Sequence, residues 1–185
     1  MAKTWKDEDI SLDPIKDQTV AVIGYGIQGD AQANNMKDSG LKVIVGLREG
    51  SPTWNKAKDD GHQVMSVADA TKQADIIHIL LPDMVQAKVY KEEIGPNLSE
   101  GNALSFSHAA AIYWKWIDAP ENVDLIMVAP KGPGSKVRET YLQNFGTPSI
   151  VAVEQDKTGK AWDRTLGIAK AIGSARAGLI QTTFK

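Results

Sequence analysis

Short apolar runs alternate with longer amphipathic segments along most of the chain. The runs are rich in Val, Ile and Leu with little apolar–polar alternation, which is typical of strands buried on both faces of a parallel sheet. They lie at 19–24, 41–47, 74–81, 102–107, 123–130 and 148–154. Helices are predicted between and after them, at 28–39, 53–60, 67–73, 83–93, 109–117, 134–143 and 158–172. This order predicts βαβ units and an α/β fold.

The end of the chain completes the predicted fold. Gly173 follows the last predicted helix and indicates its C-terminal end. The final apolar run, AGLIQTTF, is expected to add an edge strand. With no internal repeat, low-complexity tract or long linker, residues 1–185 are predicted to form a single domain. We expect a doubly wound, mainly parallel sheet with helices on both faces.

Composition and charge are those of an ordinary globular protein, with 42% hydrophobic and 24% charged residues and a formal net charge of −2. This charge gives no electrostatic reason to expect nucleic acid or an anionic membrane as a partner. No apolar run approaches the ~20 residues of a membrane span, and the polar N-terminus is unlike a signal peptide, so the expected location is the cytoplasm. The chain has no cysteine and three scattered histidines, which argues against disulfides and a metal cluster.

The segment GYGIQG, residues 24–29, stands directly between the first predicted strand and the first predicted helix. In that context Gly24 is expected to form the tight turn, Gly26 to let a pyrophosphate approach the backbone, and Gly29 to let helix and strand pack closely. The helix N-terminus would present free N–H groups to phosphates. The alternative is a glycine-rich turn that serves backbone geometry alone.

The segment after the second predicted strand indicates which dinucleotide is bound. NAD sites place a carboxylate near the ribose, whereas NADP sites offer a cation to the 2′-phosphate. Here Arg48, Ser51 and Thr53 follow the strand, which favours NADP. Glu49 argues against this, because its carboxylate could face a ribose instead. A solvated loop ending in a helix N-cap is the remaining interpretation of Arg48 and Ser51.

Seven segments together resemble the N-terminal domain of ketol-acid reductoisomerase of the short-chain class: GYGIQG, DSGLKVIVGLREGS, ADIIHILLPDMVQAKVY, EGNALSFSH, VDLIMVAPKGPG, VAVEQDKTGKA and RAGLIQTTFK. The resemblance covers nearly the whole chain. It implies a Rossmann-type, NADP(H)-binding domain. It also implies an enzyme of branched-chain amino-acid synthesis that uses NADPH and Mg²⁺ to rearrange and reduce 2-acetolactate-type substrates.

The resemblance also implies a site at the strand ends. The cofactor-binding residues that it implies are Gly24, Tyr25, Gly26, Gln28, Gly29, Arg48, Ser51, Thr53, Leu81, Pro82 and Asp83. His108 and Lys131 are implied to approach the reacting end of the cofactor as catalytic residues. From the residues alone, His108 is either an acid or base facing substrate or a structural residue. Lys131 is either a cation near substrate or a lysine of a surface turn.

Several positions depart from the family's usual sequence. The turn commonly reads GYGSQGHAQA, whereas this chain has Ile27 and Asp30. Asp30 suits the positive end of the helix dipole, but it is expected to compete with pyrophosphate for the same N–H donors. Ile27 adds bulk where a small hydroxyl residue would contact phosphate, so both changes are expected to weaken NADP(H) binding. Residues 109–114, AAAIYW, replace the usual Gly-Phe-Asn-Ile-His-Tyr, and Ser135 replaces a common histidine.

A larger departure concerns the metal. The family's magnesium ligands come from a C-terminal helical domain that would follow TTFK and is expected to be absent from this chain. We therefore expect no metal site and no bound Mg²⁺. The complete isomerisation and reduction are not expected of this chain alone.

Tyr113, Trp114 and Trp116 suggest a different class of function. On a helix, Tyr113, Trp116 and Ile117 would share one face, while Trp114 would point about 100° away from Tyr113. Because Trp and Tyr anchor many protein interfaces, one alternative is an engineered, truncated scaffold whose cofactor mouth was rebuilt for protein binding or self-association. The other is that these side chains cover apolar area that the absent domain buries.

Four further polar side chains are candidates for a functional site. His78 lies inside IIHILL and is predicted to be a hydrogen-bonded core residue. His62 follows Asp60 and Gly61 in a turn and is expected to be solvated. Asp30 and Asp83 are carboxylates near the strand ends, but their sequence positions do not define a catalytic pair.

Overall fold

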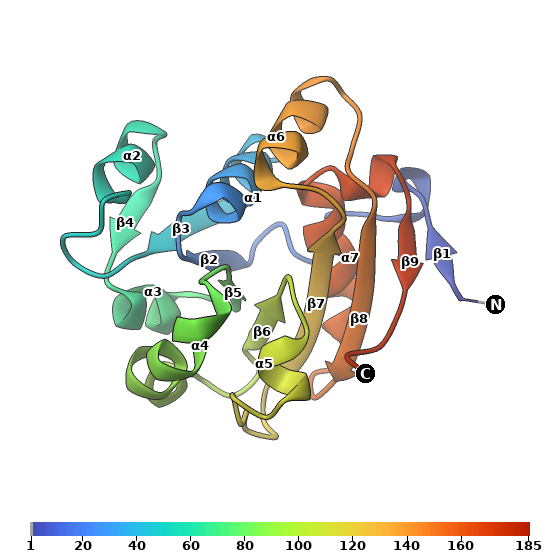
Figure 1. Cartoon of the computed structure of the whole chain (residues 1–185). Coiled ribbons are helices and arrows are strands. Elements are labelled where there is room, and N and C mark those ends of the chain that lie inside the picture. The colour runs from blue at the N-terminus through green and yellow to red at the C-terminus, as the bar shows by residue number, and fades with distance from the viewer. Residues whose placement is uncertain (1) are drawn as a thin grey trace.

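The computed structural model describes residues 2–185, which form one nine-stranded sheet in the order β1-β9-β8-β7-β6-β5-β2-β3-β4 (Figure 1). The strands are β1 (Thr4–Trp5), β2 (Thr19–Ile23), β3 (Lys42–Gly46), β4 (Gln63–Met65), β5 (Ile76–Ile79), β6 (Ala103–Phe106), β7 (Asp124–Pro130), β8 (Ser149–Gln155) and β9 (Leu179–Gln181). Six of them coincide, within a few residues, with the predicted apolar runs.

The α-helices are α1 (Ile27–Asp38), α2 (Trp54–Asp59), α3 (Val67–Gln73), α4 (Asp83–Val89), α5 (Ala110–Tyr113), α6 (Gly134–Leu142) and α7 (Ala161–Ala171). Helix α4 continues as a π-helical turn, η2 (Tyr90–Ile94), and a 3₁₀ turn, η3 (Gly95–Asn97); two further 3₁₀ turns are η1 (Asp7–Asp9) and η4 (Ser174–Arg176). Gly173 ends the α7 region at a left-handed φ of +87°, as predicted. No helix within residues 2–185 is long and apolar enough to cross a membrane.

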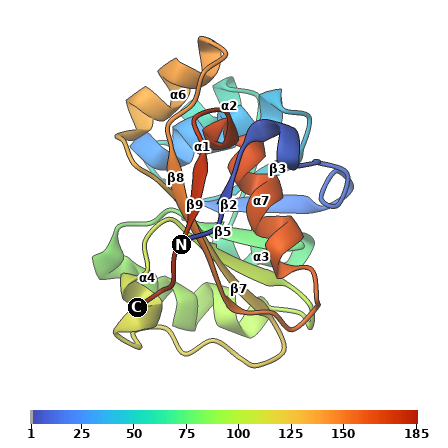
Figure 2. The ribbon, with the colours of Figure 1, turned by 90° about the vertical axis from the view of Figure 1, so that its right-hand side faces the viewer.

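Apolar residues of the central strands alternate between two core clusters, one on each face of the sheet. Val20 and Val22 of β2 belong to the cluster shared with α1 and α7. Ala21 and Ile23 belong to the cluster shared with α3 and η2. Figure 2 shows these helices on opposite sides of the sheet. This is the doubly wound α/β arrangement that the strand pattern predicts.

The winding of the chain reverses at β2. Strands β3 and β4 extend the sheet on one side of β2, and β5, β6 and β7 extend it on the other, all in parallel. The carboxyl ends of β2 and β5 therefore mark the topological switch point, where a ligand crevice is expected in this type of sheet. Strand β8 runs antiparallel to β7, and β1 runs antiparallel to β9.

The structure contradicts two predictions about local structure. The predicted helix 109–117 is reduced to the four residues of α5, because Lys115 has a left-handed φ of +54°. Tyr113, Trp116 and Ile117 therefore do not share a helical face. The final apolar run does not form an edge strand either, since β9 lies between β8 and β1. The short strands β1 and β4, which form the two edges, were not predicted.

Candidate functional site: a crevice at the strand ends

A cavity of about 790 Å³ opens at the carboxyl ends of β2, β3 and β5. The glycine turn, the loop after β3, the segment after β5 and the α4–η2 region line it. The predicted cofactor residues in this lining are Gly24, Tyr25, Gly26, Gln28, Arg48, Ser51, Thr53, Leu81 and Pro82. Three segments that are far apart in the sequence thus meet at one cavity, at the switch point of the sheet.

The three glycines of the turn meet three different spatial requirements. Gly24 has a φ of +97°, and a Cβ there would lie 3.0 Å from the Leu80 carbonyl oxygen. A Cβ on Gly29 would lie 2.2 Å from the Gly24 carbonyl oxygen, which no side chain tolerates. A Cβ on Gly26 would meet nothing within 4 Å, so this glycine leaves open space beside the cavity. These surroundings fit the roles predicted from the sequence.

The N-terminus of α1 offers backbone donors to this space. Gly26 is the N-cap, and no side chain caps the helix. The first backbone N–H to bond back within the helix is that of Asp30, to the Gly26 carbonyl oxygen at 2.8 Å. The preceding N–H groups, of residues 27–29, have no intrahelical acceptor. Ile27 and Gln28 line the cavity, so the end of α1 is suited to an anion.

The Asp30 carboxylate is engaged elsewhere. Its Oδ2 lies 2.8 Å from Nζ of Lys56, and its Oδ1 accepts a hydrogen bond from Asn34 Nδ2 at 2.8 Å. Lys56 is shared with Asp60, so it offsets the Asp30 charge only in part, and the competition with pyrophosphate stays a prediction. Ile27 is 71% exposed and lines the cavity, so its effect on phosphate binding stays a prediction.

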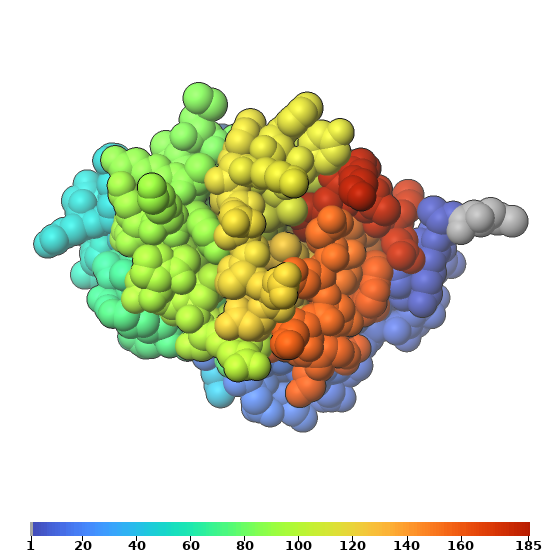
Figure 3. All heavy atoms as spheres, turned by 90° about the horizontal axis from the view of Figure 1, so that it is seen from below, coloured from blue at the N-terminus to red at the C-terminus, as the bar shows by residue number. Residues whose placement is uncertain are grey.

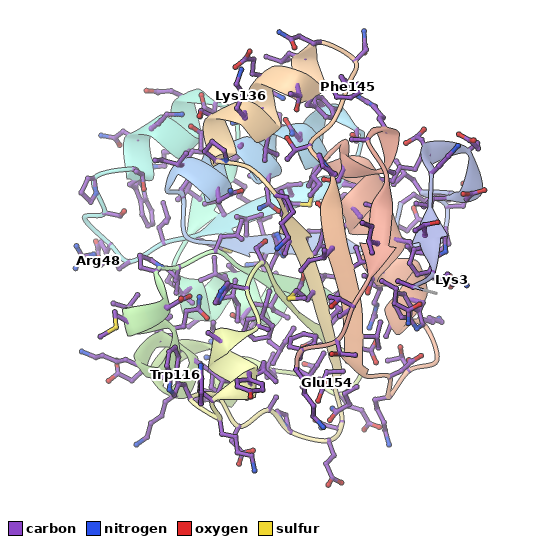
Figure 4. All side chains as sticks on the ribbon, turned by 45° about the vertical axis from the view of Figure 1, so that its right-hand side comes forward. Lys3, Arg48, Trp116, Lys136, Phe145 and Glu154 are labelled. Atoms are coloured by element: carbon purple, nitrogen blue, oxygen red, sulfur yellow. The ribbon has the colours of Figure 1, made fainter. Side chains whose placement is uncertain are left out.

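The loop between β3 and α2 carries the predicted 2′-phosphate residues. Arg48 is exposed and projects from this loop in Figure 4. The hydroxyl oxygens of Ser51 and Thr53 lie 3.2 Å apart, on the same wall of the cavity. Glu49 is exposed and does not line the cavity. A guanidinium and two hydroxyls are suited to a phosphate monoester.

A smaller cavity of about 190 Å³ shares Gln28, Leu80 and Leu81 with the first. Its lining includes Asp83 and His108, whose Oδ2 and Nδ1 atoms lie 3.8 Å apart. The structure therefore brings His108 and Asp83 together. Lys131 is exposed and lines neither cavity, although the preceding residue, Pro130, does line the smaller one.

Gln86 is a residue of this site that sequence reasoning missed. It lines the smaller cavity, and its Nε2 donates to the Leu81 carbonyl oxygen at 2.8 Å and to Asp83 Oδ1 at 3.2 Å. Gln86 thereby fixes the carboxylate that faces His108. The sequence feature that could have identified Gln86 is its position three residues after Asp83 on a predicted helix, where the two side chains are neighbours.

A buried polar network lies beneath the smaller cavity. Gln28 Nε2 donates to the Gly132 carbonyl oxygen at 3.0 Å, and Gln32 Nε2 donates to Gln28 Oε1 at 2.9 Å. Gln32 Oε1 must then accept from His78 Nε2, at 2.8 Å, while His78 Nδ1 lies 2.8 Å from Ser105 Oγ. Burial lowers the pKa of His78 to about 4. The prediction of a hydrogen-bonded core histidine is confirmed.

The prediction that His62 is solvated is wrong. Its side chain is buried, its Nε2 lies 3.1 Å from Asn34 Oδ1, and its ring meets that of Tyr25 edge-on at a centroid distance of 5.6 Å. Burial lowers the pKa of His62. The turn that carries His62 folds back on α1, which a local sequence pattern does not show. Among residues 2–185, no three His, Asp or Glu side chains gather into a metal-binding group.

Tyr113, Trp114 and Trp116, hereafter the aromatic patch, lie beside the crevice on and after α5. Their side chains are 50%, 63% and 47% exposed. Figure 3 shows the yellow segment around α5 between the green α4–η2 region and the orange and red C-terminal segments. Phe184 is buried in the same core cluster as Ile117. In this view the yellow segment also lies next to the red residues of β9 and the segment after it.

The sheet, its switch point and the glycine-lined crevice define a Rossmann-type dinucleotide-binding domain. Residues 14–178 match the family described as acetohydroxy acid isomeroreductase, NADPH-binding domain. The chain is 85% identical over all 185 residues to a ketol-acid reductoisomerase (NADP(+)) of Nitrosopumilus maritimus, of which it covers 56%. It therefore belongs to the ketol-acid reductoisomerase family, as the NADPH-binding domain.

The solved structures agree. An NADH-preferring ketol-acid reductoisomerase from an uncultured archean superposes with a TM-score of 0.95 at 46% identity, over 98% of this chain and 56% of that one. An NAD-binding semialdehyde dehydrogenase from Cupriavidus necator, at 21% identity and a TM-score of 0.74, shares the fold. The chain spans little more than half the length of its first relatives. Its identity to an archaeal enzyme gives no support to the engineered alternative.

Proposed function

We propose that this domain binds NADP(H), with NADPH preferred over NADH, and serves a ketol-acid reductoisomerase that rearranges and reduces 2-acetolactate-type substrates in branched-chain amino-acid synthesis. The main support for this proposal is that one cavity is lined both by the glycine turn and by Arg48, Ser51 and Thr53. A dinucleotide phosphate needs an anion site at each of these two places. We place the protein in the cytoplasm, as the sequence predicts.

The residues present fit the cofactor. The backbone at Gly26 and the N–H groups at the start of α1 would hold the pyrophosphate, since the turn leaves open space there. Arg48, Ser51 and Thr53 would hold the 2′-phosphate. Leu81 and Pro82 would pack against the part of the cofactor between the two cavities. The bound cofactor would supply a hydride for the reduction step.

At the reacting end, we propose that His108 and Asp83 act as a pair. The Ala110 backbone N–H donates to His108 Nδ1 at 3.3 Å, so the neutral ring carries its proton on Nε2. The Asp83 carboxylate lies 3.8 Å from Nδ1, where it would face the proton of a doubly protonated ring. The Nε2–H of His108 is the ring group free to donate a hydrogen bond to a substrate oxygen. Lys131 would reach the substrate only after a change in its loop or its rotamer.

The magnesium site is proposed to lie in the part of the family's proteins that this chain does not match. The described residues provide no cluster of carboxylates for it. We therefore expect the domain alone to bind cofactor without completing the isomerisation and reduction.

Calorimetric titration with NADPH, with NADH as the control, tests this proposal. Micromolar NADPH binding that is tighter than NADH binding would support it. If neither dinucleotide binds, the crevice does not hold a cofactor and the proposal fails. Equal or tighter NADH binding would overturn the assigned preference, and the NADH-preferring relative makes that comparison necessary. Titrating Ile27→Ser in parallel tests whether the isoleucine weakens the phosphate site.

A second proposed role concerns the aromatic patch. We propose that it contacts another polypeptide, namely the portion of the full-length protein that corresponds to the unmatched part of the relatives. Two exposed tryptophans close together in the sequence favour this role, because exposed apolar side chains that gather on one surface often mark a contact with another polypeptide. Iodide should quench Trp114 and Trp116 fluorescence in the domain and less in the longer protein. Equal quenching in a monomeric longer protein would contradict it. Self-association would instead be indicated if light scattering shows a dimer and the double substitution Trp114→Ala, Trp116→Ala dissociates it.

A further inference from the structure

A second polar cluster joins the glycine turn to the helix that follows the 2′-phosphate loop. We define the α1–α2 cluster as Tyr25, Asp30, Asn34, Lys56, Asp60 and His62. We propose that this cluster positions the loop of residues 48–53 relative to the glycine turn, so that its residues are positioning residues for recognition of the adenosine 2′-phosphate. The inference rests on the proposed NADP(H) site.

Helix α2 is short and packs on the core through few side chains. It spans six residues, Trp54–Asp59, of which Ala57 is buried and Trp54 is partly buried against the same core cluster. Helices this short are marginal without tertiary contacts. The loop that carries Arg48, Ser51 and Thr53 leads directly into α2. The position of α2 therefore decides where these three side chains lie, and polar anchorage supplements its packing on the core.

Charged contacts provide that anchorage. Lys56 Nζ lies 2.8 Å from Asp30 Oδ2 on α1 and 2.8 Å from Asp60 Oδ2 at the end of α2. Lys37 Nζ, also on α1, donates to the Asp60 carbonyl oxygen at 2.7 Å. The hydrogen bonds that Lys56 donates to Asp30 and Asp60 raise the pKa of Lys56, so its ammonium group stays charged. One lysine of α2 thus bridges two helices.

The glycine turn enters the same cluster through Tyr25. Tyr25 lines the cofactor cavity, is only 2% exposed, and directs its hydroxyl group toward Asp60 at the end of α2. The Tyr25 hydroxyl donates to Asp60 Oδ2 at 2.8 Å and accepts from Asn34 Nδ2 at 3.0 Å. Asn34 also donates to Asp30 and lies within hydrogen-bond distance of His62. Both proposed phosphate-binding segments are therefore tied to one set of hydrogen bonds.

The two segments must hold a fixed spacing if one dinucleotide is to reach both. A bidentate guanidinium contact is sensitive to displacement of its backbone, whereas the NADH ribose needs no such contact. Loosening α2 should therefore weaken NADPH binding more than NADH binding. If the cluster contributed only to overall stability, breaking it would weaken NADPH binding and NADH binding equally.

A charge-balanced variant tests this inference. Lys56→Met with Asp60→Asn removes one cation and one anion and breaks the cluster. Lys16→Met with Asp13→Asn makes the same change in an exposed ion pair that lies outside α2. We expect the first pair to lower NADPH affinity about tenfold, with NADH affinity changed about twofold or less. The control pair should change neither by more than about twofold.

Hydrogen–deuterium exchange of the cofactor-free protein gives a second readout. Amides of residues 47–60 should exchange faster in the Lys56→Met, Asp60→Asn variant than in the control, and Lys56→Arg should retain the wild-type rate. Unchanged exchange, or equal losses of NADPH and NADH affinity, would overturn the inference. If the wild-type domain binds no dinucleotide, the proposed function fails, and the exchange rates still decide whether the cluster holds the loop.

Discussion

The two ends of the crevice are built differently. At the adenosine end, the glycine turn and the loop of Arg48 are joined by the α1–α2 cluster, and Tyr25 and His62 are buried between the helices. At the reacting end, His108 is exposed, α5 is one turn long, and the two tryptophans of the aromatic patch are about half exposed or more. The residues of the first end are tied together by buried side chains, whereas those of the second are exposed to solvent.

Under the proposed function, this difference corresponds to a division between cofactor recognition and substrate reduction. Recognition of a phosphorylated dinucleotide needs donors and cations at fixed spacing, and one sheet with its flanking helices can supply them. Reduction of a substrate also needs a closed, water-poor pocket, which an open strand edge does not provide. The buried polar contacts lie at the adenosine end and beneath the crevice, whereas the mouth of the crevice beside α5 is open to solvent.

The largest expected effect is at the glycine turn, which both ends share. Gly29→Ala should destabilise the fold by about 3 kcal/mol and abolish NADPH binding, because its Cβ would lie 2.2 Å from the Gly24 carbonyl oxygen. Gly26→Ala should lower the free energy of unfolding by about 1 kcal/mol or less, since its methyl group meets no other atom. It should still weaken NADPH binding at least about tenfold, because the methyl group would occupy the space proposed for the pyrophosphate. Urea unfolding and calorimetry measure both. Equal stabilities of the two variants would refute this account of the turn.

A second prediction separates the adenosine end from the reacting end. Arg48→Ala should weaken NADPH binding about 10- to 100-fold, because a charge-assisted contact to phosphate is lost, and should leave NADH within about twofold. Calorimetric titration with each dinucleotide measures the ratio. Lys42→Ala is a suitable control, since the exposed Lys42 starts β3, at the end of the strand opposite the crevice. If Arg48→Ala lowered NADH affinity as much as NADPH affinity, Arg48 would not discriminate between the two cofactors.

The buried network beneath the reacting end predicts a pH dependence. His78 has a pKa near 4 in the folded protein, against 6.5 when unfolded, so the unfolded chain binds more protons between these values. This contribution to stability is fully present above pH 6.5 and is lost as the pH falls toward 4. Between pH 7.5 and 5 the wild-type protein should lose about 2 kcal/mol more than His78→Gln. Identical pH profiles in urea unfolding would mean that His78 titrates normally.

The smallest effect is expected at the mouth. Replacing Trp114 and Trp116 together by Ala should change the free energy of unfolding by about 1 kcal/mol or less, and NADPH affinity by about twofold or less, because both side chains are largely exposed. Circular dichroism during urea unfolding and calorimetry measure these quantities. A loss above about 2 kcal/mol would show that the patch belongs to the core rather than to a contact surface.

The sequence predicted the central strands and the crevice because their signals are local and physical. Buried parallel strands read as continuous apolar runs, and a GxGxxG turn after a strand has few other uses. Gly24, Gly26 and Gly29 have the surroundings predicted for them, and Arg48, Ser51 and Thr53 line the same cavity. Whether these residues bind the cofactor as assigned stays a prediction.

What the sequence could not show depended on contacts between distant segments. His62 was expected in solvent because its turn looks exposed, but the turn packs against α1. Asp30 was expected to compete with a phosphate, but its carboxylate contacts Lys56, which lies 26 positions further along the chain. The helix through Tyr113 to Ile117 was predicted from its periodicity, and a single left-handed residue, Lys115, ended it. Pairings and breaks of this kind leave no periodic signal.

Gly134 opens α6 where the loop after β7 crosses the first turn of α1. Its backbone is helical, so glycine is needed there for room: a Cβ would lie 2.1 Å from the Ile27 carbonyl oxygen. This makes position 134 a sequence marker for the crossing. A homologue with alanine or serine at this place must carry its loop and its helix in a different relative pose. Its mouth would then have another shape, whatever its remaining residues suggest.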